Sequence, residues 1–160
     1  MKFTLESIHN NARAGRLTIN SKTINTPSFM TIGTYGSVKT IDPKDLVRCN
    51  VEIILSNAFH LMLRPGMDLI EKYGGLHNFM GWNGLILTDS GGYQVFSLGK
   101  NVKINKNGAE FQSPFNGDKV IMTPEISIDV QTKINSDIMM IFDECIKYPS
   151  DFSQTEKSMD

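Results

Sequence analysis

The sequence reads LILTD at residues 85–89, and the same pattern occurs twice more, as IILSN at residues 53–57 and as MMIFD at residues 139–143. Each segment is a run of apolar residues that stops on a polar one, and such runs are typical of strands buried on both faces of a parallel sheet. Parallel α/β sheets hold their chemistry at the carboxyl ends of the strands. The pattern predicts an α/β fold in which one amide and two carboxylates converge on one rim.

The composition is that of a globular protein, with 40% hydrophobic and 21% charged residues in a chain of 160, enough for one domain. A net charge of −1 gives no chain-wide signal for nucleic acid, so any such site must be local. Without a signal peptide or a run near the ~18 apolar residues of a membrane span, we expect a cytoplasmic protein. Cys49 and Cys145 match no zinc spacing, and we expect buried free thiols.

Two regions alternate polar and apolar residues, which indicates antiparallel strands. The first, residues 1–32, has a turn signal at Asn20-Ser21. Its strands are expected at residues 3–5, 16–19 and 22–24. The second, residues 102–122, contains the hairpin signals Asn107-Gly108 and Asn116-Gly117. It predicts a β-meander inserted between a strand and its helix.

Helices are predicted between the buried strands from capping residues and prolines. They are expected to begin at Asp42-Pro43, at Pro65-Gly66 and at Thr123-Pro124, with a loop or short helix over residues 58–64. Near the end, SQTE at residues 153–156 is a capping box, and the sequence stops at Asp160 one turn later. Three strand–helix units cannot close a barrel, so the last strand would expose an apolar edge. We therefore expect residues 1–160 to be a single incomplete domain, the first part of a larger fold or one half of an assembly.

Asp89 is the first candidate for chemistry, because it stands where a buried strand gives way to Ser90-Gly91-Gly92. The glycines let the backbone pass close to a ligand and aim its N–H groups inward. A carboxylate that caps a helix or turn is the structural alternative. Ser90 has no histidine or lysine at a recognisable local spacing, which argues against a nucleophilic serine.

Asp143 is the second candidate. A carboxylate at a strand end can accept two parallel hydrogen bonds from an amidine-like edge, such as N1–H and the 2-amino group of guanine. The alternative is a structural aspartate paired with an arginine or with loop amides. Tyr93 can stack on a base, and a core aromatic is an equal alternative.

Neighbouring polar and aromatic residues receive simpler interpretations. Asn57 is expected to orient a nearby carboxylate, and His60 to be a structural histidine with satisfied hydrogen bonds. Gln94, Phe96 and Trp82 are interpreted as packing residues.

The segment LTDSGGYQVFSL at residues 87–98 resembles the signature of bacterial tRNA-guanine transglycosylases, the base-exchange enzymes of queuosine synthesis. Further blocks agree with this resemblance, and the similarity runs in order from Met1 to Asp160. These blocks are TPSFM at residues 26–30, GTYG at 33–36, NAFHLMLRPG at 57–66 and MIFDEC at 140–145.

The resemblance implies a (β/α)8 TIM barrel, of which this chain would supply about the first three units, an N-terminal antiparallel β element and the inserted meander. The family exchanges guanine at wobble position 34 of tRNAs with GUN anticodons for preQ1 or queuine. An aspartate attacks C1′ of the ribose and expels guanine, and the incoming base then attacks the ribosyl-enzyme with retention of configuration. The target nucleotide must be flipped out of its stack.

The resemblance also implies roles for individual residues. Asp89 would be the catalytic proton acceptor that deprotonates the incoming base, Tyr93 would stack on the base, and Asp143 would bind the amidine edge. The substrate-binding set would be Asp89, Ser90, Gly91, Gly92, Tyr93 and Asp143.

The resemblance places the family's nucleophilic aspartate and its Cys-x-Cys-x-x-Cys…His zinc subdomain beyond Asp160. We therefore expect no metal ligand or cofactor here, structural Zn²⁺ only in a C-terminal part, and no activity from the isolated chain. The implied partners are the tRNA anticodon loop, a guanine or preQ1 base and a second subunit of a homodimer. A non-catalytic base-binding or partner subunit, and an unrelated glycosidase-like barrel with two carboxylates, remain as alternatives.

Overall fold

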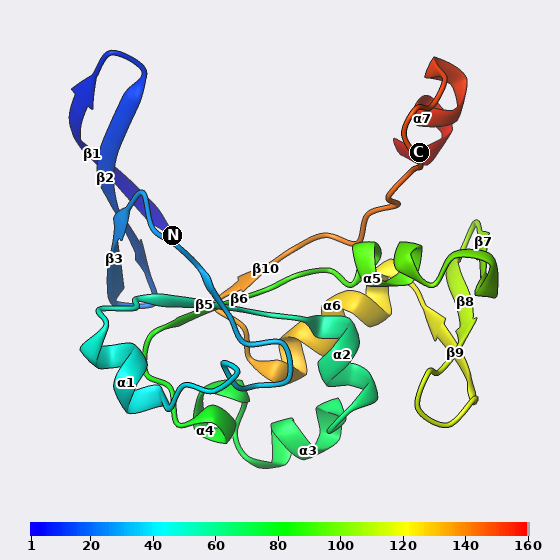
Figure 1. The fold of residues 1–160 in the computed structure, drawn as a ribbon, viewed down its shortest axis with the longest axis horizontal. Helices are drawn as coiled ribbons and strands as arrows, with labels where there is room; N and C mark the ends of the chain where they lie inside the picture. Colours follow the sequence, from blue (N-terminus) through cyan, green and yellow to red (C-terminus); the bar gives the residue numbers. More distant parts are fainter. Residues whose placement is uncertain (160) are drawn as a thin grey trace.

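The computed structural model describes residues 1–159, apart from the side chain of Lys100, and the expected chain end at Asp160 lies outside the described residues. A parallel sheet in the order β10-β6-β5-β4 lies between two antiparallel sheets (Figure 1). Its strands are β4 (Thr31–Ile32), β5 (Ile53–Ser56), β6 (Leu85–Thr88) and β10 (Ile138–Met139). The strands therefore follow one another across the sheet in the order of the sequence.

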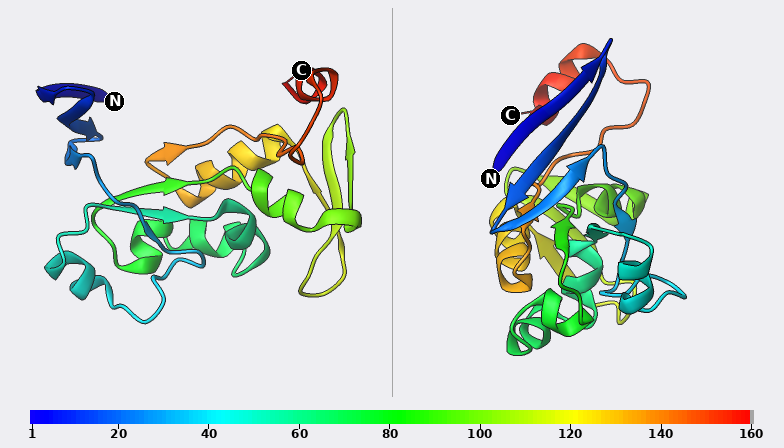
Figure 2. Two further views of the ribbon diagram at one scale, coloured as in Figure 1. Left: turned by 45° about the horizontal axis from the view of Figure 1, so that its top comes forward. Right: turned by 90° about the vertical axis from the view of Figure 1, so that its left-hand side faces the viewer.

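The two predicted buried strands β5 and β6 are confirmed. They pair in parallel from Ile53 opposite Leu85 to Ser56 opposite Thr88, and all four of these residues are fully buried. Helices cover the sheet, mainly on one face (Figure 2). Apolar side chains from α2 (Ala58–Leu63), α3 (Met67–Lys72), α4 (Leu76–Met80) and α6 (Pro124–Ile134) form a hydrophobic core together with Ile54 and Ile86 of the sheet. Burial of these side chains is the main force that holds the carboxyl ends of β5 and β6 side by side.

The predicted helix starts at Asp42-Pro43, Pro65-Gly66 and Thr123-Pro124 agree with the structure, and two further helices, α4 and α5, have no side-chain cap. The helices are α1 (Pro43–Arg48), α2 (Ala58–Leu63), α3 (Met67–Lys72), α4 (Leu76–Met80), α5 (Gly92–Ser97), α6 (Pro124–Ile134) and α7 (Phe152–Met159), with a 3-10 turn at Gly99–Asn101. Asp42 accepts a hydrogen bond from the backbone N–H of Lys44, and Thr123 accepts one from that of Ile126. None of the helices in residues 1–159 is long and apolar enough to cross a membrane.

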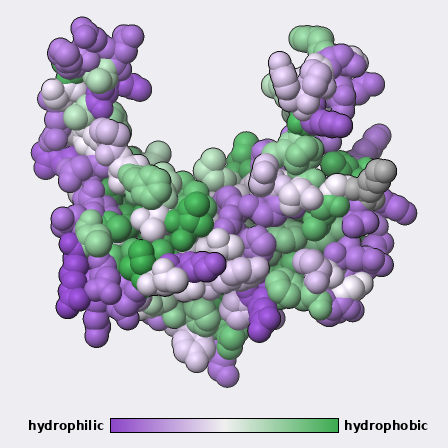
Figure 3. Space-filling view, in the orientation of Figure 1, coloured by the Kyte–Doolittle hydropathy of each residue, from purple (hydrophilic) through white to green (hydrophobic). Residues whose placement is uncertain are grey.

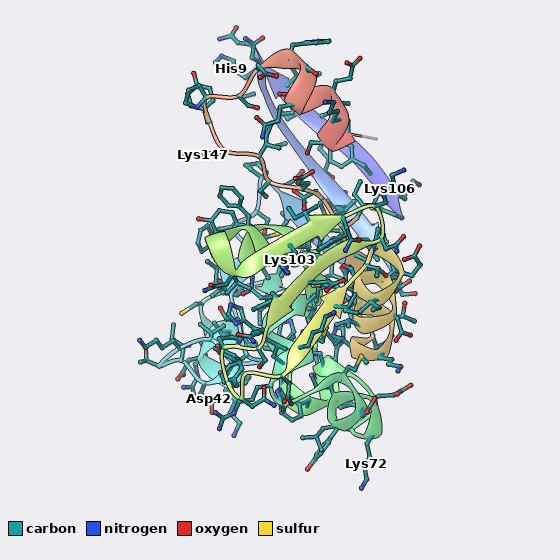
Figure 4. The ribbon with its side chains drawn as sticks, turned by 90° about the vertical axis from the view of Figure 1, so that its right-hand side faces the viewer. His9, Asp42, Lys72, Lys103, Lys106 and Lys147 are labelled. Atoms are coloured by element: carbon teal, nitrogen blue, oxygen red, sulfur yellow. The ribbon has the colours of Figure 1, made fainter. Side chains whose placement is uncertain are left out.

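Both predicted antiparallel regions are present. The first sheet contains β1 (Lys2–His9), β2 (Ala12–Ile19) and β3 (Lys22–Thr26), and the meander contains β7 (Val102–Asn105), β8 (Gly108–Gln112) and β9 (Lys119–Met122). The β1–β2 hairpin projects from the sheet with His9 near its tip, and Lys103 and Lys106 belong to the meander (Figure 4). Ile19 and Ile24 pack against Ile53 and Leu85, so the first sheet is anchored at the parallel sheet.

The third strand is shorter than the sequence predicted, because β10 ends at Met139 rather than at Asp143. The side-chain amide of Gln131 forms hydrogen bonds with both backbone groups of Met140. It accepts from the N–H and donates to the C=O, each at 2.9 Å. A side chain thus replaces the next rung of the ladder. Among residues 1–159, β10 has β6 as its one strand neighbour, and Ile141 is 79% exposed. The expected exposed apolar edge is confirmed.

Two smaller predictions are wrong. Helix α7 begins at Phe152 and not at the capping box, because Asp151 accepts a hydrogen bond from Gln154 N at 2.8 Å. The two cysteines are free as expected, but Cys49 is exposed and Cys145 is half-buried. Figure 3 shows apolar surface below the projecting β1–β2 hairpin. Phe29 is 83% exposed.

Candidate functional site

The carboxyl ends of β5 and β6 form a rim, called here the carboxyl rim, on which the predicted polar residues meet. The backbone N–H of Asp89 donates to Ser56 O at 3.1 Å, so the β5–β6 pairing extends one residue beyond the strand. This bond brings Asp89 next to the start of α2. The predicted convergence of Asn57 and Asp89 on one rim is confirmed.

Three N–H donors hold the half-buried carboxylate of Asp89. Its Oδ1 accepts from the backbone N–H of Ala58 at 2.9 Å, and its Oδ2 accepts from Asn57 Nδ2 and from Gln94 Nε2, the latter at 3.0 Å. A carboxylate has about four acceptor positions, so roughly one remains free. Asn57 orients the carboxylate as predicted, whereas Gln94 does not serve only as a packing residue. The polar amide of Gln94 between Tyr93 and Val95 was the available signal.

The glycine pair turns the chain and admits Asp143. Gly91 has φ of +86°, a left-handed conformation that favours glycine, and it precedes the first turn of α5. A Cβ atom on Gly92 would collide with the backbone oxygen and the carboxylate Oδ1 of Asp143. The absence of a side chain at Gly92 therefore allows the Asp143 segment to lie against the start of α5.

Ser90 connects the two carboxylate residues. Its hydroxyl donates to Asp143 Oδ1 at 2.8 Å and accepts from Gly92 N at 3.2 Å. Asp143 thus reaches the rim although it lies four residues beyond the end of β10. Its Oδ2 lies 3.5 Å from Cys145 Sγ, and burial, together with the charge of Asp143, raises the pKa of this thiol. The thiol is therefore a protonated, weak donor to Asp143.

Tyr93 is not a core aromatic, because it is 66% exposed on the first turn of α5. Its ring centroid lies 6.4 Å from that of Phe96, which is itself 39% exposed. Trp82, by contrast, is buried as predicted, and its Nε1 donates to Leu85 O at 3.1 Å. Tyr93 and Phe96 thus form an exposed aromatic surface on α5, beside Gly92.

His60 is not a satisfied structural histidine. Its ring lies between Tyr35, at 5.0 Å, and the edge of Phe59, at 5.3 Å, and its buried Nδ1 has no hydrogen-bond partner in the described residues. Burial lowers the pKa of His60, against the opposing effect of the Asp89 charge, so the ring is neutral at pH 7. The other buried side-chain atom without a partner, among the residues that the structure describes, is Gln94 Oε1. Both atoms belong to residues that surround Asp89.

A cavity of about 600 Å³ lies beside the Asp143 segment, and its lining includes Gly92 and Asp143 but not Asp89 or Tyr93. Gly92 and Phe96 line it on α5, Ile141 and Asp143 line it on the segment after β10, and Lys106 lines it from the meander. Apolar walls with a few convergent polar groups are typical of sites for planar organic ligands. Residues 1–159 contain no group of three His, Cys, Asp or Glu side chains that could hold a metal ion.

Comparison with known proteins agrees with these features. The family model described as queuine tRNA-ribosyltransferase matches residues 8–160. Proteins named queuine tRNA-ribosyltransferase from Nitrosospira multiformis and Nitrosomonas eutropha are 54% and 55% identical to this chain over 160 and 159 residues. These matches cover 100% and 99% of this chain but 44% of each relative. The chain thus spans less than half the length of these curated relatives, and it belongs to the queuine tRNA-ribosyltransferase family.

Proposed function

We propose that this chain forms the base-binding part of a tRNA-guanine transglycosylase, a pentosyltransferase that replaces guanine at the wobble position of tRNA by preQ1 or queuine. The observation that carries the proposal is the arrangement of two carboxylates on one rim. Asp89 is held by three N–H donors, and the Ser90–Gly92 turn joins it to Asp143. The family membership supports the same reaction class.

Asp143 and Tyr93 are proposed to recognise the base. A guanine-type base presents N1–H and a 2-amino group on one edge, and a carboxylate accepts two parallel hydrogen bonds from such an edge. Asp143 lines the cavity, and Ser90 donates a hydrogen bond to one of its carboxylate oxygens. The exposed ring of Tyr93 offers a flat face for stacking, worth about 1–3 kcal/mol per base.

Asp89 is proposed to accept the proton of the incoming base. As N9 of this base forms its bond to C1′ of the ribose, the bond between C1′ and the enzyme carboxylate breaks, and the N9 proton passes to Asp89. The three N–H donors fix the direction of the carboxylate for this transfer. The aspartate that attacks C1′ in the first displacement matches no residue of this chain.

The proposed complete enzyme is a (β/α)8 barrel. Parallel strands that follow the sequence order, with helices packed mainly on one face, support this architecture. Residues 1–160 are then one incomplete domain of the barrel. A homodimer, a zinc subdomain outside these residues and a cytoplasmic location, where tRNA is modified, belong to the same proposal.

Transfer of radiolabelled guanine into a tRNA with G at the wobble position tests the reaction. The purified 160-residue chain is run beside Asp89→Ala, and mass spectrometry confirms the chain lengths. We expect no exchange from either chain, because the nucleophile is lacking. Exchange that disappears in Asp89→Ala would place a nucleophile within these residues.

A thermal-shift panel tests base binding separately. We expect guanine and preQ1, but not adenine or simple sugars, to raise the melting temperature of the chain. A response to sugars alone would contradict the proposal and favour the glycosidase alternative. Base binding without exchange agrees with the proposal, and also with a non-catalytic base-binding subunit. Mixing the chain with a C-terminal transglycosylase fragment that carries the nucleophile separates these two. Exchange that disappears in Asp89→Ala supports the proposal, and no exchange supports a non-catalytic subunit.

A further inference from the structure

Gln131 lies at the centre of a buried polar cluster that the proposed reaction does not use. It projects from α6, is fully buried, and bonds on one side to the segment that leads to Asp143, through the N–H and C=O of Met140 at 2.9 Å each. On the other side its Oε1 accepts from Thr88 Oγ1 at 2.9 Å. Thr88 directly precedes Asp89, so one amide contacts the chain on both sides of the candidate site.

Ser127, also fully buried on α6, completes this cluster. Its hydroxyl donates to the backbone oxygen of Ser90 at 2.8 Å, and Gln131 Nε2 lies 3.2 Å from Ser127 O and 3.3 Å from Ser127 Oγ. The acceptor and both N–H groups of Gln131 therefore have partners. A buried amide with all its hydrogen bonds made has little freedom to move, so it holds its neighbours at defined positions.

The location of this amide matters because the backbone ladder stops there. The last residue pair between β10 and β6 is Met139 with Thr88. Beyond this pair, hydrogen bonds from the Gln131 side chain connect the two segments of the chain. Asp89 and Ser90 follow on one chain, and Asp143 follows on the other. Ser90 then bonds to Asp143, so its geometry depends on how far apart the two chains are held.

We propose that Gln131 is a positioning residue of the base site, which sets the separation between the Asp89–Ser90 turn and the Asp143 segment and thereby the affinity for a guanine-type base. This role rests on the proposed function of Asp143 in base recognition. Gln131 touches neither the base nor the reacting atoms. It acts through Met140 and through Thr88 and Ser127.

Amide hydrogen exchange of the free chain tests the positioning without any ligand. In Gln131→Met the Met140 N–H loses its acceptor, and we expect its exchange to accelerate at least about tenfold more than that of core amides such as Ile54. Val130→Ala is the matched control, because Val130 is a fully buried neighbour on the same helix that packs in the apolar core. It should accelerate all amides alike. An equal effect of both variants on Met140 and Ile54 would overturn the proposal.

Gln131→Glu gives a second readout that a packing role would not produce. The introduced carboxylate faces Met140 O without a donor, and burial favours its neutral form, which regains one O–H donor. Protection of Met140, corrected for intrinsic exchange, should therefore rise as the pH falls in this variant and stay level in Gln131→Met. A protection factor independent of pH in Gln131→Glu would contradict the role of the donor.

Calorimetric titration with guanine then measures whether the Gln131 side chain affects base affinity. We expect about tenfold weaker binding by Gln131→Met and unchanged affinity in Val130→Ala. Equal affinities of wild type and Gln131→Met would overturn the proposal. If the wild-type chain binds no guanine, the proposed base recognition by this chain fails. Amide hydrogen exchange alone then decides whether Gln131 positions the Asp143 segment.

Discussion

The two rims of the parallel sheet each carry aspartates, and their surroundings differ. At the amino ends of β6 and β10, called here the amino rim, Asp137 Oδ2 accepts from Ile86 N and from His77 Nε2, both at 2.9 Å. Its Oδ1 lies 3.4 Å from Asn20 Nδ2, and its side chain is 8% exposed. Asp137 thus ties α4, the β2–β3 turn and the two strands together.

On the carboxyl rim, Asp89 is also held by three donors, but neighbouring groups are left without partners. His60 Nδ1 and Gln94 Oε1 are the two buried side-chain atoms in residues 1–159 that lack a hydrogen bond. Such atoms are uncommon in folded proteins and call for a water or a ligand. The comparison teaches that the two carboxylates have equal numbers of hydrogen bonds and that the difference lies in the groups around them, since the unpaired atoms of His60 and Gln94 are near Asp89.

The largest expected difference between the rims is in base affinity. Asp143→Ala removes the two charge-assisted hydrogen bonds that we propose to guanine, each worth about 1.5–3 kcal/mol, and we expect affinity to fall at least about 100-fold. Isothermal titration with guanine measures it. Asp137→Asn on the amino rim is the control and should leave the affinity of the folded chain unchanged. Equal losses would mean that the rims do not differ in function.

For the free energy of unfolding, we expect the amino rim to contribute more than the carboxyl rim. Asp137→Ala leaves the N–H of Ile86 buried without its acceptor, while the His77 ring keeps Gly84 O at 3.1 Å, and we expect the free energy of unfolding to fall by about 3 kcal/mol. Asp89→Ala should cost about 1 kcal/mol, because water can reach the half-buried carboxyl rim. Urea unfolding followed by circular dichroism compares them. The reverse order of the two losses would break the comparison.

A smaller effect is expected where Gly92 approaches Asp143. Gly92→Ala places a methyl group against Asp143 and should weaken guanine binding about tenfold, by the cost of overpacking one methyl group. Gly117→Ala is the control, since it has a left-handed φ of +77° and no atom within 4 Å of the added Cβ. It should lower stability without changing affinity. Unchanged binding by Gly92→Ala would show that this contact does not shape the base site.

The smallest expected effect is a pH dependence from His60. Because burial lowers its pKa, the unfolded chain binds more protons than the folded one near and below the ordinary histidine value of about 6.5. Stability contributed by His60 is therefore complete above this value and is lost as the pH falls, by less than about 1.4 kcal/mol per pH unit. Unfolding between pH 5 and 7.5 should show a smaller slope in His60→Gln than in wild type.

His9→Gln is the control for this pH series, because His9 lies near the tip of the exposed β1–β2 hairpin (Figure 4). Its slope should equal that of wild type. An equal reduction in both variants would indicate that the slope does not come from the environment of Asp89.

Much of the fold followed from local sequence patterns. The apolar runs identified β5 and β6, the glycine and asparagine turns identified the meander, and Asp42 and Thr123 marked helix starts. Helices α4 and α5 were missed because the residues before them, Gly75 and Gly91, offer no side-chain cap. The length of β10 was wrong because a buried side chain, and not the strand's own sequence, ends its pairing.

The candidate site was only partly predictable for the same reason. The positions of Asn57 and of the Asp89–Gly92 segment were predictable, because these residues directly follow strand ends. The direction of a parallel sheet determines which rim such residues occupy. The contact of Gln94 with Asp89 depends on the turn into α5, and the unpaired Nδ1 of His60 depends on aromatic neighbours. Such contacts leave no periodic signal in the chain.

The sequence by itself determined the α/β class, the buried strands, the glycine turn and the family, because these depend on periodicity and on contiguous residues. Only the tertiary structure decided that Asp143 reaches Ser90 from beyond the end of β10, and that Gln131 joins the two chains where their ladder stops. These contacts link residues 9 to 53 positions apart in the chain. Their geometry is set by the packing of α6 against the sheet, which no single segment specifies.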